Sequence, residues 1–185
     1  MTSRRQLLVL TAALLGGCKA GAGPDKGARR PVGEGQMTAK LREAVAKAAH
    51  GQGSDASLEL DYSKGHELSG ITHFQVDGAG RYRLTSNVTE GRKEFTTAGV
   101  LEAAERDGLF VAVENARLLD LASSTRNIGD DEEPVIVTLR RGDQSRRLML
   151  WHDDAVRNPD FHGFEEHLLG LVRKLSAGAV RSTAN

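Results

Sequence analysis

The chain has 185 residues with a formal net charge of zero, and 39% of the residues are hydrophobic. This composition predicts one soluble domain with a proper core. The single cysteine, Cys18, excludes a disulfide framework, while an acidic second half with few aromatic residues excludes the usual composition of a nucleic-acid-binding protein.

The first residues have the pattern of an export signal. Arg4 and Arg5 supply positive charge, and Leu7 to Leu15 form an apolar run that is too short to span a bilayer. The run ends in Leu15-Gly16-Gly17-Cys18, which resembles the lipobox of bacterial lipoproteins. Residues 1–17 are therefore expected to be a signal peptide that is removed before Cys18.

This resemblance implies that Cys18 is acylated on its sulfur and its amine and holds the protein at the membrane. Lys19 stands where an aspartate retains some lipoproteins at the inner membrane, so the resemblance favours the outer membrane, facing the periplasm or the surface. The stretch Ser3 to Leu8 also resembles a twin-arginine signal. Export by the general route or by the twin-arginine route stays open.

Residues 18–36 are rich in glycine, proline and charge, which predicts a flexible tether. Residues 37–50 follow as a short helix, with Thr38 as candidate N-cap and a thin apolar stripe that predicts loose docking. From Cys18 to His50 there are seven basic and three acidic residues, whereas residues 51–185 contain sixteen basic and twenty-two acidic residues. A basic stalk at anionic lipid fits this division, as does a linker with incidental lysines.

The head domain, residues 51–178, starts with a strand in which Leu58, Leu60 and Tyr62 alternate with acidic residues. A polar loop over Ser63 to Ser69 is expected next. Two strands then flank a predicted three-residue loop, Asp77-Gly78-Ala79, which pairs Phe74 with Tyr82 and keeps apolar residues on one face.

A helix is predicted from Thr96 or Thr97 to about Asp107, and Gly108 is expected to end it. The apolar residues that follow Gly108 are expected to be buried in the core. Residues 112–133 are harder to interpret. Their leucines predict a short buried turn, and the acidic residues that follow predict an exposed loop.

The clearest hairpin runs from Val135 to Trp151 around a Gly142-Asp143 turn, which pairs Val135 with Leu150. Asn158-Pro159 then predicts the capped start of an amphipathic helix that runs to Gly178, before a disordered tail at residues 179–185. Together these elements predict an α+β fold, a mostly antiparallel sheet with helices packed on one face in two layers.

The second face of the hairpin is a candidate binding surface. Ile136, Met149 and Trp151 share it, and with helices on only one side of the sheet they would form an apolar patch bordered by charge. The alternative is that a helix or the segment 112–133 covers them.

No catalytic residue, metal site or cofactor is predicted. His162 and His167 are five residues apart on a helix and cannot both face one ion, and His152-Asp153-Asp154 is expected to be a solvated loop. The nucleophile and phosphate-binding motifs of hydrolases and nucleotide-binding proteins are missing.

The order of elements from Leu58 to Leu175 resembles the emfourin group of small bacterial metalloprotease inhibitors. A first strand, a glycine-bearing loop, two strands, a helix, a hairpin and a last helix follow one another. The resemblance implies binding to a thermolysin-like metalloprotease through the glycine-bearing loop, and it assigns no individual inhibitory residue. Lys64, Gly65 and His66 in this loop are candidate binding residues.

Two functions from different classes follow. The first is a lipid-anchored, non-enzymatic module that binds another envelope protein, with a protease as one candidate. The alternative is an envelope hydrolase with an unrecognised active site, which predicts a polar cleft with a histidine close to a carboxylate. A small-ligand carrier would need an apolar cavity, which this order of strands gives no reason to expect.

Overall fold

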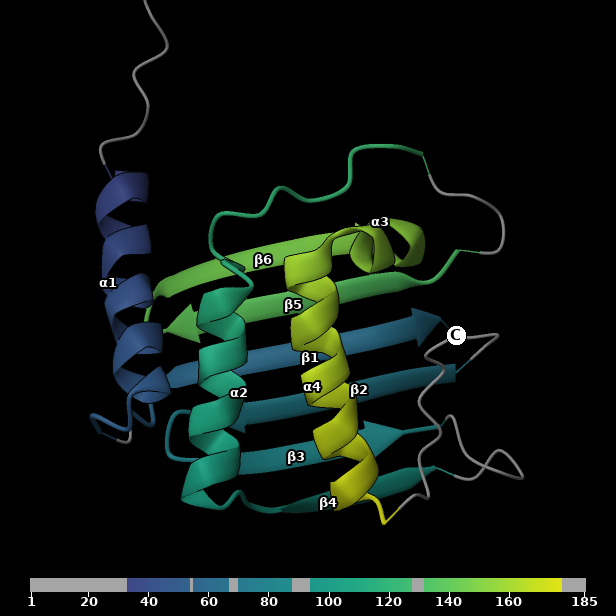
Figure 1. Cartoon of the computed structure of the whole chain (residues 1–185), viewed down its shortest axis with the longest axis horizontal. Coiled ribbons are helices and arrows are strands. Elements are labelled where there is room, and N and C mark those ends of the chain that lie inside the picture. Colours follow the sequence, from purple (N-terminus) through teal and green to yellow (C-terminus); the bar gives the residue numbers. More distant parts are fainter. Residues whose placement is uncertain (1–32, 54, 67–69, 88–93, 128–131, 178–185) are drawn as a thin grey trace, which may run out of the picture. The chain divides into compact units, whose positions relative to one another are not determined.

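Six strands form one antiparallel sheet with the order β4-β3-β2-β1-β5-β6 (Figure 1). The structure is a computed structural model that describes residues 33–53, 55–66, 70–87, 94–127 and 132–177. The strands are β1 (Leu58–His66), β2 (Gly70–Asp77), β3 (Arg81–Ser86), β4 (Phe95–Val100), β5 (Pro134–Arg141) and β6 (Gln144–Trp151). Successive residues of each strand alternate between the two faces of the sheet.

The helices lie on one face of this sheet. They are α1 (Gly33–Ala49), α2 (Ala103–Asn115), α3 (His152–Arg157) and α4 (Pro159–Leu175). α2 and α4 cross the strands on the same side, and α1 packs beside α2 (Figure 1). Between these layers the side chains of Phe74, Phe110 and Phe164 are almost completely buried. The predicted α+β fold, an antiparallel sheet with helices on one face, is confirmed.

The β5–β6 hairpin has the predicted register. Val135 pairs with Leu150, and the residues that follow continue in the same register as far as Arg141 and Gln144. Gly142 has a φ of +60° in the two-residue turn, a conformation that glycine adopts without steric cost. The alternation of apolar residues and the glycine turn were therefore sufficient to position this hairpin.

The β2–β3 hairpin is displaced from its prediction. Phe74 pairs with Leu84 rather than with Tyr82, so the loop is Gly78-Ala79-Gly80. The loop has the predicted length of three residues but begins one residue later, which moves the register by two. Because a shift of two leaves every side chain on its face, the same residues still reach the core.

The prediction that a helix begins at Thr96 or Thr97 is wrong. Those residues belong to β4, which pairs with β3, and α2 begins only after Glu102. The side chains of Glu102 and Glu105 form a capping box with each other's backbone. Threonine is a preferred N-cap residue and glutamate is not. The sequence therefore favoured a helix start at Thr96 or Thr97 over the actual start after Glu102.

Gly108 lies within α2 and does not end a helix. A Cβ at this position would be 3.5 Å from Cε1 of His167 on α4, which is an ordinary contact distance, so the packing of α2 on α4 does not require a glycine here. The apolar block predicted after it is the buried side of α2, formed by Leu109, Phe110 and Val113.

α1 begins at Gly33, five residues before the predicted cap Thr38, so the last residues of the predicted tether are helical. It does not dock loosely, because Leu41, Ala44 and Val45 are at most 3% exposed. The described residues form one compact unit that includes α1. The predicted signal peptide, most of the tether and the predicted tail lie outside the described residues.

The C-terminal helix starts as predicted. The Asn158 side chain accepts a hydrogen bond of 3.0 Å from the backbone N–H of Phe161, and Pro159 is the first helical residue. α4 ends at Leu175, before Gly178. His152-Asp153-Asp154, predicted as a loop, instead forms the first turn of α3.

Candidate functional site

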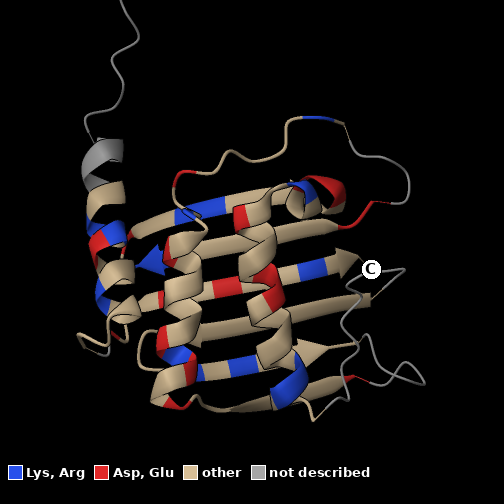
Figure 2. Ribbon diagram, viewed as in Figure 1, with Lys and Arg blue, Asp and Glu red and all other residues tan. Residues whose placement is uncertain are grey.

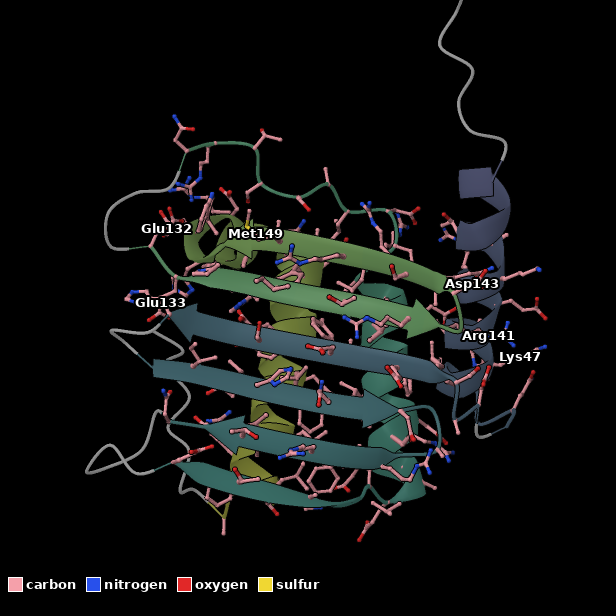
Figure 3. The ribbon with its side chains drawn as sticks, turned by 180° about the vertical axis from the view of Figure 1, so that it is seen from behind. Lys47, Glu132, Glu133, Arg141, Asp143 and Met149 are labelled. Atoms are coloured by element: carbon pink, nitrogen blue, oxygen red, sulfur yellow. The ribbon has the colours of Figure 1, made fainter. Side chains whose placement is uncertain are left out.

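The sheet face opposite the helices is the candidate binding surface, and we call it the open face (Figure 3). In β1 the residues Leu58, Leu60 and Tyr62 are buried against the helices, so the residues between them point the other way. Strand pairing arranges the open face in rows. One row contains Ala98, Arg83, Gln75, Asp61, Thr138 and Arg147, and the next contains Thr96, Thr85, His73, Ser63, Ile136 and Met149.

The structure brings the three predicted apolar contacts together on the open face. Ile136 lies opposite Met149, and Trp151 lies opposite Pro134 in the same hairpin. Figure 3 labels Met149 on this hairpin. All three side chains are half-buried. They are therefore neither a fully exposed patch nor completely covered by another segment, which were the two alternatives considered from the sequence. We call Ile136, Met149 and Trp151 the hairpin patch.

The segment that follows α2 runs along the free edge of β6 and borders the hairpin patch. Its Ser124 N–H donates to the Met149 carbonyl at 2.9 Å, and the Ser124 hydroxyl accepts from the Trp151 N–H at 3.1 Å. The Trp151 indole N–H donates to the Arg126 carbonyl at 3.2 Å. The indole is therefore held in one orientation at the rim of the open face, with part of its ring accessible.

The other three predicted contacts do not lie in a loop, because β1 continues to His66. Gly65 lies on the open face, opposite Ile71 and two residues after Ser63, which pairs with Ile136. Lys64 and His66 occupy positions on the helix side, and Lys64 is only 7% exposed. Of these three, only Gly65 shares a face with the hairpin patch.

A polar group lies beside the hairpin patch on the open face. His73 Nε2 is 2.9 Å from Asp61 Oδ1, and Gln75 donates to the other oxygen of this carboxylate at 3.0 Å. The hydrogen bond with His73 lowers the pKa of Asp61, so the group is a carboxylate at neutral pH. It borders a shallow hollow of about 310 Å³, lined by Glu59, Asp61, Gln75, Asp77, Arg81 and Arg83.

Under the sheet, on the helix side, a charged cluster is buried between β1 and α4. Tyr62 donates a hydrogen bond of 2.8 Å to Oε1 of Glu165, and Lys64 Nζ lies 3.3 Å from the same oxygen. The side chains of Lys64 and Glu165 are 7% and 4% exposed. Burial, and then the negative charge of Glu165, raise the pKa of Tyr62 well above its usual value. Lys64 therefore neutralises a buried carboxylate.

Because of this burial, the protein is expected to lose stability at alkaline pH through Tyr62. Above the ordinary tyrosine pKa of 10.0 the unfolded chain releases this proton and the folded chain keeps it, so unfolding becomes more favourable as pH rises. The free energy of unfolding of the Tyr62→Phe variant should fall less steeply above pH 10, because this variant has no hydroxyl proton to release at position 62. Urea midpoints measured between about pH 8 and pH 11 test it, and equal slopes in both proteins would contradict it.

The open-face polar residues were missed in the sequence. Asp61, His73 and Gln75 stand at every second position of strands whose other side was read as core. That alternation was a usable signal for a shared face. The contact between Asp61 and His73 also required the correct β1–β2 pairing, which had not been predicted.

Among the described residues, no group of three or more histidine, cysteine, aspartate or glutamate side chains is arranged to hold a metal ion. No helix in the described part of the chain is long and apolar enough to cross a membrane. A scan of the sequence against models of protein families finds no matching family, and a search of the curated proteins finds no match.

Proposed function

We propose that this protein is a non-enzymatic protein-binding module of the bacterial envelope. An acyl group on Cys18 holds it at the membrane, and the open face of its sheet contacts another protein. The observation that carries the binding proposal is a half-buried apolar patch on the sheet face that no described helix packs against. Apolar groups bordered by charge on an ordered surface are typical of partner sites.

The open face suits a protein partner better than a small ligand. Its hollow is shallow, and its rows alternate arginine, amide and carboxylate groups beside Ile136 and Met149. Such a surface combines an apolar patch near one edge of the sheet with neighbouring polar rows, and protein–protein interfaces combine apolar and polar groups in the same way. Trp151, whose indole N–H is hydrogen-bonded to the Arg126 carbonyl, lies at the edge of this surface. Tryptophan is among the residue types enriched at the hot spots of protein–protein interfaces.

The anchor is tested on Cys18 itself. Cells expressing the full chain are labelled with a fatty acid analogue, and the protein is partitioned between detergent and water. The parent chain should take up label and enter the detergent phase, while Cys18→Ser should do neither. Equal behaviour of both chains contradicts the lipid anchor and leaves the binding proposal intact.

Binding is tested with residues 32–185 as bait in an envelope extract. Met149→Glu places a charge in the hairpin patch and keeps Trp151, the single tryptophan, as a fluorescence probe. Val156→Ala is the control, since this valine is 44% exposed on α3 and lies outside the open face. A partner should bind the parent and the control but not Met149→Glu. Equal recovery with all three argues against the open face.

A metalloprotease is the narrower candidate for the partner, and it is supported by the emfourin resemblance. The support is the order of a first strand, a hairpin and a last amphipathic helix along the sequence, although a further strand, β4, stands between β3 and α2. Adding residues 32–185 to a thermolysin-like protease should slow peptide cleavage in proportion to their concentration. No change at saturating concentrations removes this candidate.

A hydrolase remains the second candidate because of one observation. His73 contacts Asp61 and lies directly opposite Ser63 on the open face, so the three residue types of a serine hydrolase share one surface. This proposal expects hydrolysis of activated esters that His73→Ala abolishes. A rate no higher than that of buffer, or one unaffected by His73→Ala, rejects it.

A further inference from the structure

The two edge strands of the sheet, β4 and β6, differ in whether another segment of the chain hydrogen-bonds to their outer side. The β6 edge is covered by the chain itself, through the hydrogen bonds of Ser124 with Met149 and Trp151. The outer edge of β4, at the other end of the sheet, makes no backbone hydrogen bond with any other part of the chain that the structure describes. Within the described part of the chain, β4 therefore has a row of main-chain donors and acceptors without backbone partners.

The pairing with β3 defines which groups these are. The Leu101 N–H donates to the Gly80 carbonyl at 2.9 Å, so Leu101 faces inward. In an antiparallel pair the inward and outward residues alternate. The N–H and C=O groups of Thr96, Ala98 and Val100 therefore point away from the sheet.

β4 also lacks the features that usually protect an edge. Its sequence from Phe95 to Val100 contains no charged residue and no proline, and its register with β3 is unbroken by a bulge. The charge map shows the strand without a basic or acidic residue (Figure 2). Val100 is 67% exposed, the most exposed of the large apolar side chains described. An uncharged edge strand without a proline or a bulge can add a strand from another chain.

We propose that β4 pairs with the β4 of a second copy of this chain, antiparallel and about a two-fold axis at Ala98. This register is the one that uses all three outward residues. Ala98 meets Ala98 of the second copy, and Thr96 meets Val100 at both ends. The two sheets become one sheet of twelve strands, with the helices of both copies on the same side and the open faces continuous.

Within the paired strands no charged residues face each other, but one pair of glutamates faces each other at each end of the pairing. The same register places Glu94 opposite Glu102 of the second copy, and both residues are exposed. Like charges directly opposite each other weaken strand pairing, and salt screens them. Self-association should therefore tighten as salt increases, and Glu94→Gln should tighten it at low salt.

Sedimentation of the full chain carrying Cys18→Ser tests the proposal. The chain should shift from monomer to dimer as its concentration rises. Ala98→Lys puts two like charges at the axis and should weaken the dimer by about tenfold or more. Ser145→Lys is the control, since it adds the same charge at an exposed position of β6. A chain that stays monomeric, or a dimer that Ala98→Lys does not weaken, overturns the proposal.

Cross-linking provides a second readout that does not depend on loss of binding. In the Cys18→Ser chain, Ala98→Cys places two thiols at the axis, where the Cα atoms of a hydrogen-bonded pair are about 5.5 Å apart and a disulfide can form. Ser145→Cys is the control. Under mild oxidation Ala98→Cys should give a covalent dimer much faster than the control. Equal rates overturn the proposed register.

Discussion

Replacing Lys64 with methionine is expected to lower the free energy of unfolding by about 3 to 5 kcal/mol. The ammonium of Lys64 lies 3.3 Å from Glu165, and both side chains are almost completely buried. Removing the cation leaves the carboxylate in the interior without a counter-charge, and the cost of that unpaired charge dominates. Urea unfolding followed by circular dichroism measures the loss.

The double variant separates this cost from the value of the ion pair itself. Lys64→Met with Glu165→Leu removes both charges, and such replacements are often neutral or stabilising. The Tyr62 hydroxyl then loses its acceptor, which costs about 1 to 3 kcal/mol. Adding Tyr62→Phe should recover that part. If Lys64→Met alone unfolds as easily as the parent, the buried carboxylate does not depend on Lys64.

The same cluster shows where inference from the sequence failed. Lys64 stands in phase with Leu58, Leu60 and Tyr62, so continuing the alternation would have placed it inside. Its charge and the nearby glycine instead suggested a loop. Its partner Glu165 lies about a hundred residues away on another element, and no local pattern identifies such a pair.

The parts of the fold that were predicted correctly had two agreeing local signals. The β5–β6 hairpin had both alternation and a glycine turn, and α4 had both a cap at Asn158 and an apolar stripe. β4 and α2 had conflicting signals, since Thr96 and Thr97 suit an N-cap as well as a strand. Only the pairing of β4 with β3, a long-range contact, selects the strand.

The hairpin patch is an intermediate case. The alternation placed Ile136, Met149 and Trp151 on one face correctly, because the register of the hairpin followed from its turn. How much of the patch is exposed depended on residues 123–126, whose polar sequence has no periodic pattern. Ser124 reaches β6 through one backbone hydrogen bond to Met149, and the hydroxyls of Ser123 and Ser124 accept from the backbone N–H groups of Met149 and Trp151. Serine is common in polar loops, so its presence in the sequence did not identify these contacts.

Replacing Gly65 with alanine is expected to cost about 3 kcal/mol or more of stability. Gly65 has a φ of +106°, and a Cβ there would lie 1.9 Å from the carbonyl oxygen of Gly70. Gly70 itself has a φ of +98° and lies diagonally opposite Gly65, where β1 ends and β2 begins. An alanine would force the strands apart.

This result would decide between two roles for Gly65, which is also a candidate contact on the open face. Gly163→Ala is the matched control, because a Cβ at that exposed position of α4 meets nothing within 4 Å. It should stabilise the protein by about 0.5 to 1 kcal/mol, as alanine does in a helix. If Gly65→Ala instead unfolds like the parent but binds a captured partner more weakly, Gly65 serves recognition. A large loss of stability assigns it to the turn, and the contact surface is then the hairpin patch and the polar rows beside it.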